Sequence, residues 1–327
     1  MTPRIRAIAI ALVVATPPLS AQAPAKSLPQ RIADDFIALY GLHPGYRINH
    51  AKGIVLTGTF TPSPGATALS VAPHLATTVP VIVRFSDAGG VPTIPDKSPY
   101  TTPRGIAIRF NLPGGAFTDI VANSTNGFPV GNGEDFAEFL EAVAATNKAP
   151  TPHPNPIEKF LGSHPRALAF VKTPKPMPVS FANEEWYGNN AFIFVNAKGV
   201  KQPGRYQIVP VDGKKYLDSA AAAKTPPNFL MDEIAKHVAK QPVQYKLTVQ
   251  LANPGDPTSD GSIVWPDDRR IVELGTISIT TVAPNNAALQ KSLAFNPIYL
   301  TNGITLSDDQ LPIIRSSVYA LSVAHRR

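Results

Sequence analysis

The chain has 327 residues, of which 43% are hydrophobic, and it contains 35 prolines, 22 glycines and no cysteine. This length and apolar content exclude a disordered chain and support a large buried core, while the prolines predict long loops around the regular elements. The formal net charge is +7, but lysine and arginine are scattered along the chain, so a nucleic-acid-binding protein is not indicated. Without cysteine the fold has no disulfides, and its stability must come from its core or from a bound ligand.

Residues 1–23 have the pattern of a secretory signal peptide. Two arginines precede a short apolar run at residues 7–15, and the Ala-Gln-Ala tripeptide at 21–23 fits the small-x-small cleavage rule. The apolar run is too short to span a bilayer, and no later segment of the sequence predicts a membrane span. We therefore expect cleavage after Ala23, a periplasmic or secreted protein, and one mature domain at 24–327.

The first half of the mature chain is predicted to contain one helix followed by four strands. Apolar residues at helical spacing predict a helix over Ser27–Tyr40, ended by a glycine. Alternating apolar residues then predict strands at 54–60, Val79–Ser86, Gly105–Leu112 and Thr118–Asn123. The short connections between these strands favour an antiparallel meander.

The second half mixes helices and strands. Helices are predicted at Gly133–Thr146, at Pro156–Val171 with a break at Pro165, and at Pro227–Lys240, whereas the three prolines in Lys172–Pro178 indicate an extended linker. Further strands are predicted at Ala191–Val195, Tyr206–Val211, Val243–Leu251 and Arg270–Thr280. The total of about eight strands predicts an α+β fold, an eight-stranded antiparallel β-barrel with surrounding helices.

The final helix is expected to open near Ser307–Asp309, because acidic residues suit a helix N-terminus, with Pro312 in or near the first turn. Arg315 and Tyr319 are four residues apart, so their side chains meet on one helical face. A guanidinium beside a phenol favours the phenolate, which is one of the few axial ligands that proteins offer haem iron. An Arg-Tyr pair at this spacing is common, however, and indicates little by itself.

His50 lies in the Arg-x-x-His-Ala-Lys-Gly motif at 47–53, directly before the first predicted strand. A side chain at a strand start can point into a cavity, but a lone histidine there is more often structural than catalytic. The other motifs of the chain decide between these two interpretations.

Taken in order, these motifs resemble those of the haem catalases, in particular the short, exported catalase-related peroxidases, over roughly residues 28–327. The resemblance implies that His50 is the distal catalytic base. It implies that Arg84 of the Val-Arg-Phe-Ser segment binds a haem propionate and that Ser86 hydrogen-bonds the distal histidine. It also implies that Asn123, at the end of Asp-Ile-Val-Ala-Asn, is the distal asparagine.

The resemblance extends to the rest of the haem site. Phe128 and Phe136 fall at the spacing of the two distal-side phenylalanines, and Pro-Arg-Gly at 103–105 matches a further landmark. The Arg-x-x-x-Tyr motif implies that Tyr319 is the iron ligand and that Arg315 keeps it ionised. Arg47 and Arg326 are implied as additional propionate-binding residues. The implied cofactor is b-type haem (heme b), held non-covalently.

Several positions depart from the full-length catalases. The sequence ends soon after Tyr319, so we expect the wrapping segment and C-terminal helical domain of those enzymes to be absent. Thr102 replaces an acidic channel residue, Ala88 replaces a channel-narrowing valine, and polar Asn49 precedes the distal histidine. A short, wide entrance is the expected consequence, with Asp87 as a candidate substitute charge.

The resemblance implies a haem peroxidase that reduces hydrogen peroxide or organic hydroperoxides and oxidises small organic electron donors, with weak catalase activity. Two alternatives stay open at this point. Asn49 also fits an enzyme that rearranges fatty-acid hydroperoxides, as allene oxide synthases do. A non-catalytic carrier of haem or lipid would not need His50 and Asn123 together. We expect a monomer or small homo-oligomer that binds no nucleic acid and does not span a membrane.

Overall fold

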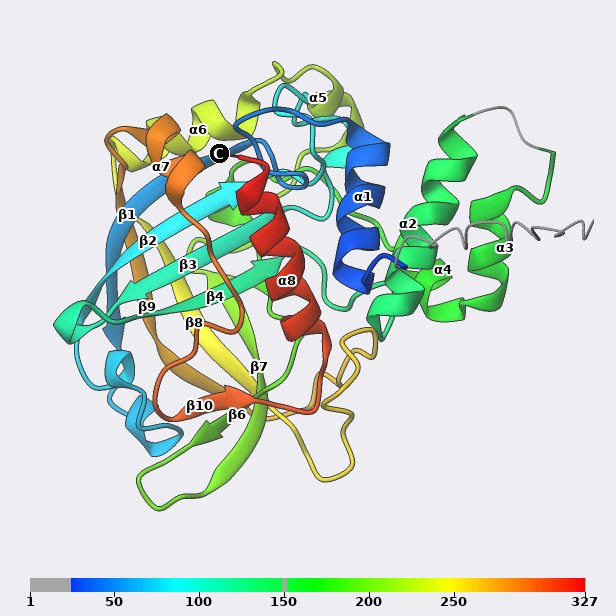
Figure 1. The fold of residues 1–327 in the computed structure, drawn as a ribbon. Coiled ribbons are helices and arrows are strands. Elements are labelled where there is room, and N and C mark those ends of the chain that lie inside the picture. Colours follow the sequence, from blue (N-terminus) through cyan, green and yellow to red (C-terminus); the bar gives the residue numbers. More distant parts are fainter. Residues whose placement is uncertain (1–24, 149–151, 327) are drawn as a thin grey trace, which may run out of the picture.

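The computed structural model describes residues 25–148 and 152–326 (Figure 1). The predicted signal peptide at 1–23 lies outside these described residues. None of the helices within these ranges has the length and hydropathy needed to cross a bilayer.

Eight antiparallel strands close into a barrel, which confirms the predicted fold class (Figure 1). Each strand in the ring pairs with the next, and the last pairs again with the first. In ring order the strands are β1 (Gly53–Pro62), β2 (Val79–Ser86), β3 (Gly105–Asn111), β4 (Phe117–Asn123), β5 (Trp186–Tyr187), β7 (Lys201–Pro210), β8 (Val243–Leu251) and β9 (Ile271–Val282).

The predicted number of barrel strands is right, but one predicted strand lies outside the ring. The prediction at Ala191–Val195 corresponds to β6 (Phe192–Val195), which pairs with β7 on one side and with β10 (Ile304–Leu306) on the other. The ring is completed instead by β5, which contains two residues and joins β4 to β7. A strand this short contains no alternation, so the pattern used for prediction could not reveal it.

Alternate residues of the strands fill the barrel. On β2 the predicted apolar face, Val79, Val81, Val83 and Phe85, is at most 2% exposed, and these side chains join the main hydrophobic cluster. Because neighbouring side chains on a strand point to opposite faces, Arg84 and Ser86 point out of the barrel. The predicted site residues of β2 therefore face the outer surface of the barrel wall.

Helices cover that outer surface. As Figure 1 shows, α8 (Leu311–Ala324) lies across the outside of the barrel, with α1 (Leu28–Tyr40) and α2 (Gly133–Lys148) beside it. The three helices share a second apolar cluster that includes Phe36, Leu140 and Val318. The remaining helices are α3 (Pro156–Ser163), α4 (Pro165–Lys172), α5 (Ser219–Ala223), α6 (Phe229–Val238) and α7 (Asn286–Ser292).

Most helix boundaries follow the predictions, including the break at Pro165, but the last helix begins later than expected. The helix starts at Leu311 rather than near Ser307. Asp309 lies just before it and accepts a hydrogen bond from the Leu311 backbone N–H at 2.8 Å. Pro312 falls in the first turn, as predicted, because its missing N–H needs no partner there.

Candidate active site

One cross-strand row organises the site on the outer wall of the barrel. Gly53 pairs with Ser86, Ser86 pairs with Gly105, and Gly105 pairs with Asn123. Residues directly opposite one another on antiparallel strands point to the same side of a sheet. Ser86 and Asn123 therefore face the same side, with a residue lacking a side chain between them.

The two glycines of this row leave room for the functional side chains. A Cβ at Gly105 would lie 3.0 Å from both His50 Cε1 and Ser86 Oγ, and a Cβ at Gly53 would lie 2.5 Å from Arg84 Nη2. Neither contact is tolerable without a shift of the neighbouring group. The distal histidine thus packs directly against the main chain of β3.

His50 occupies a left-handed turn before β1, with a backbone φ of 54°. Such a conformation costs a non-glycine residue about 1–3 kcal/mol and persists only where neighbouring groups hold it. The Asn49 side chain does this, because its Oδ1 accepts hydrogen bonds from the backbone N–H groups of His50 (3.0 Å) and Gly89 (2.8 Å). Asn49 is therefore a turn-stabilising residue.

The imidazole of His50 is held in a neutral state. Its Nδ1 lies 3.1 Å from Ser86 Oγ, as the sequence motifs predict, which leaves Nε2 as the nitrogen available to a substrate. Burial, and then the charges of Arg84, Arg315 and Arg47, lower the pKa of His50 to about 3. The ring can consequently act as a proton acceptor at any physiological pH.

Asn123 presents an amide donor from the end of β4. Its Oδ1 accepts a hydrogen bond from the Thr125 backbone N–H at 2.9 Å. The oxygen end of the side chain is thereby engaged, and the –NH₂ end remains to donate to a ligand. This orientation fits the predicted role of Asn123.

Three arginines predicted from separate motifs meet at the C-terminal end of α7. The backbone carbonyls of Gln290 and Leu293 accept hydrogen bonds from Arg47, both at 2.8 Å, and also from Arg326, at 3.0 and 2.9 Å. Arg84 donates to Gln290 Oε1 at 3.1 Å. The structure thus brings together side chains that are far apart in the sequence.

The guanidinium groups of this arginine cluster lie close enough to affect one another. No carboxylate within the described part of the chain forms an ion pair with Arg47 or Arg84. Burial and the neighbouring guanidiniums of Arg84 and Arg326 lower the pKa of Arg47. Burial, with a further contribution from Arg326, lowers the pKa of Arg84 to about 9. Two carboxylates such as the propionates of haem would relieve this repulsion through charge-assisted hydrogen bonds, so the cluster fits the predicted cofactor.

Tyr319 on α8 is held by the predicted arginine. Arg315 donates to the phenol oxygen from Nε at 3.3 Å and from Nη2 at 3.0 Å. The third guanidinium nitrogen donates to Asn190 Oδ1, and Asn190 Nδ2 donates to the buried carboxylate of Asp309 at 2.7 Å. This chain of hydrogen bonds fixes the proximal side chains.

Sequence reasoning missed Asn190 as part of the proximal group. Asp309 was noticed only as an acidic residue near the start of a helix, and Asn190 belongs to no motif. The contacts of Asn190 with Arg315 and with Asp309 join segments that are distant in the sequence, so neither periodicity nor spacing could have revealed them.

Phe128 and Phe136, the two phenylalanines that the resemblance places on the distal side, pack against each other in one aromatic group. Their ring centroids are 5.1 Å apart, and Phe136 lies 6.1 Å from the ring of Phe36 on α1. Both rings are only half-buried. The pair thus connects α2 to the barrel side of the site.

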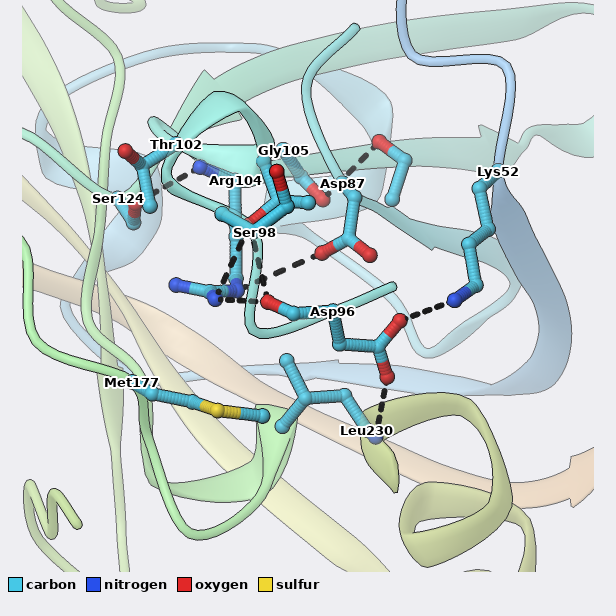
Figure 2. A network of polar contacts seen from close by, with 12 residues as sticks. Lys52, Asp87, Asp96, Ser98, Thr102, Arg104, Gly105, Ser124, Met177 and Leu230 are labelled. Atoms are coloured by element: carbon cyan, nitrogen blue, oxygen red, sulfur yellow. Dashed lines mark hydrogen bonds and ion pairs between the residues drawn. The ribbon is translucent and has the colours of Figure 1, made fainter. Parts of the chain in front are cut away.

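Figure 2 shows a network of buried charged side chains that includes Lys52, Asp87, Asp96 and Arg104. Arg104 Nε is 3.4 Å from Asp87 Oδ1, and Lys52 pairs with Asp96. Asp87 follows Ser86 and Arg104 precedes Gly105, so their ion pair joins the ends of β2 and β3 on the side opposite His50. Burial, reinforced by Asp96, raises the pKa of Asp87 to about 8. Asp87 is fully buried, which contradicts its expected role as a charge in a solvent entrance.

Thr102 and Ala88, the other two positions at which the sequence departs from the full-length catalases in the channel, differ in exposure. Thr102 and Arg104 line a surface hollow of about 670 Å³ together with Lys97, Lys175 and Met177. Ala88 is buried, with 9% of its surface exposed. The hollow therefore reaches Arg104, the residue before Gly105, on the side of the sheet opposite His50.

The barrel, its covering final helix and the arginine cluster on its outer wall fit the class of protein that the sequence motifs resemble, the haem-binding β-barrel enzymes. A family model described as Catalase matches residues 45–327. Catalase-related peroxidases from Synechococcus elongatus and Mycolicibacterium paratuberculosis are 32% and 35% identical to this chain over 91% of it, covering 88% and 94% of their own lengths. The chain belongs to the catalase family.

Larger relatives are covered only in part. Catalase isozyme 2 of Ricinus communis is 28% identical over 86% of the chain, which spans 60% of that catalase. A solved structure of a bacterial catalase superposes with a TM-score of 0.76 at 22% identity, over 87% of this chain and 58% of that one. This structural likeness shows the shared fold. Family membership implies a haem cofactor, and the residues described above fit it.

Proposed function

We propose that the protein is a haem peroxidase that reduces hydrogen peroxide or an organic hydroperoxide and oxidises small organic donors. The two relatives that share 88% and 94% of their lengths with the chain are both named catalase-related peroxidases. The observation that carries the proposal is the half-buried, neutral His50, which is held by Ser86 on the same side of the wall as the amide donor of Asn123.

The cofactor would be b-type haem, since the sequence has no cysteine for thioether attachment. Tyr319 would hold the iron, and Arg47, Arg84 and Arg326 would hold the propionates. Haem, when bound, supplies a redox-active iron to which a peroxide can bind. The protein supplies positioning, proton transfer and charge.

His50 moves the proton in this proposal. Its Nε2 takes the proton from the inner oxygen of the peroxide and delivers it to the outer oxygen, so that the O–O bond breaks and water leaves. Ser86 holds the opposite ring nitrogen and so fixes the direction of Nε2. The amide of Asn123 donates a hydrogen bond that keeps the peroxide next to the imidazole.

The test is the optical spectrum of purified protein before and after peroxide, followed by oxidation of a phenol such as guaiacol. We expect a haem spectrum that changes on peroxide addition and returns to the starting form as the phenol is oxidised. Protein without bound haem, or a haem spectrum indifferent to peroxide, would contradict the proposal.

The geometry supports the peroxidase more directly than it supports the two alternatives. Asn49 suggested a hydroperoxide-rearranging enzyme, but its side-chain oxygen is used by two backbone N–H groups of the turn. A carrier does not require His50 and Asn123 to be oriented on one face of the wall. Product analysis with a fatty-acid hydroperoxide, with and without an electron donor, distinguishes rearrangement from donor-dependent reduction.

We also propose a periplasmic or secreted location, from the pattern of residues 1–23, and a monomer or small homo-oligomer.

A further inference from the structure

Two tyrosines outside the proposed catalytic group each donate a hydrogen bond to a glutamate. Tyr187 Oη donates to Glu185 Oε2 at 2.6 Å, and Tyr216 Oη donates to Glu184 Oε1 at 2.8 Å. The two acceptors are consecutive in the segment that leads into β5. Short O–H···O⁻ contacts of this kind are strong and place a proton acceptor directly on each phenol.

The first tyrosine lies next to the active site. Tyr187 is the direct cross-strand partner of Asn123 on the neighbouring strand. Side chains in such a pair share one face, with Cβ atoms about 4.5–5.5 Å apart. Tyr187 therefore adjoins the residue proposed to hold the peroxide.

The second tyrosine reaches the protein surface. Tyr216 is 40% exposed, whereas its acceptor Glu184 is 3% exposed. Burial and then the charges of the glutamates raise the pKa of Tyr216, and burial with the Glu185 hydrogen bond raises the pKa of Tyr187. Both phenols thus remain protonated and act as hydrogen-bond donors at neutral pH.

A phenol loses its electron readily only if its proton leaves at the same time, and each of these phenols has a base in place to take that proton. We propose that Tyr187 and Tyr216 form a one-electron relay through which the enzyme oxidises bulky aromatic donors, phenols or aromatic amines, at its surface. The inference rests on the proposed peroxidase function and adds an oxidation site for donors too large to reach His50.

The relay moves one electron in each pass. Tyr187 gives an electron to the active site that peroxide has oxidised, and its proton moves to Glu185. Tyr216 then gives an electron to Tyr187, while Glu185 returns the proton to Tyr187 and the proton of Tyr216 moves to Glu184. A donor at the surface gives an electron to Tyr216, Glu184 returns its proton, and the donor releases a proton to water. In two passes, two electrons and two protons from two donors convert one hydrogen peroxide to two waters.

The test uses the haem-loaded enzyme and one phenol in two forms, free in solution and tethered to a soluble dextran that can meet only the protein surface. For the tethered phenol, we expect Tyr216→Phe and Tyr187→Phe to lower the oxidation rate by at least about tenfold. Free phenol should be oxidised at the wild-type rate. Tyr299→Phe is the matched control, because Tyr299 is also 40% exposed and no hydrogen bond to a carboxylate is found for it among the described residues.

A second readout does not depend on turnover. Rapid-freeze electron paramagnetic resonance after peroxide, without a donor, should show a tyrosyl radical in wild type that is lost in Tyr187→Phe. A spin-trap adduct mapped by peptide mass spectrometry should lie on Tyr216. Glu184→Gln keeps the hydrogen-bond geometry but removes the base, and it should also slow oxidation of the tethered phenol.

Unchanged oxidation of the tethered phenol by Tyr216→Phe, or an adduct on another tyrosine only, would overturn the relay. Wild type that oxidises free but not tethered phenol would also overturn it and would leave the peroxidase proposal intact. Wild type that oxidises neither phenol after peroxide would refute the peroxidase function itself. Circular dichroism melts of each variant separate these outcomes from misfolding.

Discussion

Replacement of His74 should make the protein more resistant to acid. This histidine is 1% exposed, neither ring nitrogen has a hydrogen-bond partner, and its ring lies 4.8 Å from Phe110 and 5.9 Å from Phe60. Burial lowers its pKa to about 4 from an ordinary value of 6.5. The structure therefore places the imidazole of His74 in an apolar part of the interior.

The direction of this pH effect follows from the lowered pKa of His74. The unfolded chain takes up a proton at His74 below pH 6.5, whereas the folded protein takes it up only near pH 4. His74 therefore has no effect on the free energy of unfolding above pH 6.5. Below this pH the free energy of unfolding decreases as the pH falls toward 4. Linkage between proton binding and unfolding gives a loss of about 2 kcal/mol at pH 5 and about 3 kcal/mol at pH 4.

Urea unfolding of wild type and His74→Phe at pH 7.5 and pH 5 measures this difference. Phenylalanine keeps an aromatic ring beside Phe60 and Phe110 but cannot take up a proton. Between the two pH values, the free energy of unfolding of the variant should therefore decrease by about 2 kcal/mol less than that of wild type. His153→Gln is the control, since that side chain is 79% exposed and its charged partner, Glu158, is also at the surface. Surface ion pairs contribute little to stability, so this change should leave the difference nearly unchanged. An identical pH dependence in wild type and His74→Phe would refute the reasoning.

Four further predictions concern the active site and the N-terminus. Tyr319→Phe should weaken haem retention and alter the ferric spectrum; an unchanged spectrum would remove Tyr319 as the iron ligand. His50→Ala should keep haem but slow the stopped-flow reaction with peroxide by about 10²–10⁴-fold, and a wild-type rate would exclude it as the base. Asn123→Ala should slow the same reaction less than His50→Ala does, because it removes one hydrogen bond and no proton transfer. A larger decrease in rate for Asn123→Ala would contradict these roles. Exported protein should begin at or near Pro24 by mass spectrometry, and an intact Met1 would contradict the signal peptide.

The balance between peroxidase and catalase activity is a separate prediction. Thr102 removes a charge from the expected channel, and it lines a surface hollow of about 670 Å³. Oxidation of an aromatic donor should therefore outweigh oxygen evolution from hydrogen peroxide on the same preparation. Oxygen evolution at the rate of a full-length catalase, with negligible donor oxidation, would overturn this expectation.

Periodic features of the fold were accessible from the sequence, and contacts that join distant segments were not. The alternation on β2 correctly separated the interior residues from Arg84 and Ser86, because burial on one face leaves a direct pattern in the chain. The two-residue β5 contains no such pattern, so the ring position of Tyr187 went unseen. Helix α7 is short and was not predicted, although its terminal carbonyls collect Arg47 and Arg326.

The site residues themselves were located by resemblance of motifs rather than by periodicity. The structure joins Arg315 to Tyr319 within one motif, and it brings His50 and Ser86 into contact from two motifs that lie 36 residues apart. Asn190 completes the proximal group through side-chain hydrogen bonds. Such bonds depend on how the barrel closes, so no local signal marks the residue.

The glycines at 53 and 105 have a consequence for how this enzyme could diversify or be engineered. The wall behind the base is main chain, and a Cβ at either position would collide with His50, Ser86 or Arg84. Selection therefore cannot tune selectivity by enlarging side chains on that wall. A mutant library would keep both glycines invariant and place its variation at the rim, at Thr102 and along the surface loops, where changes in bulk leave the base in place.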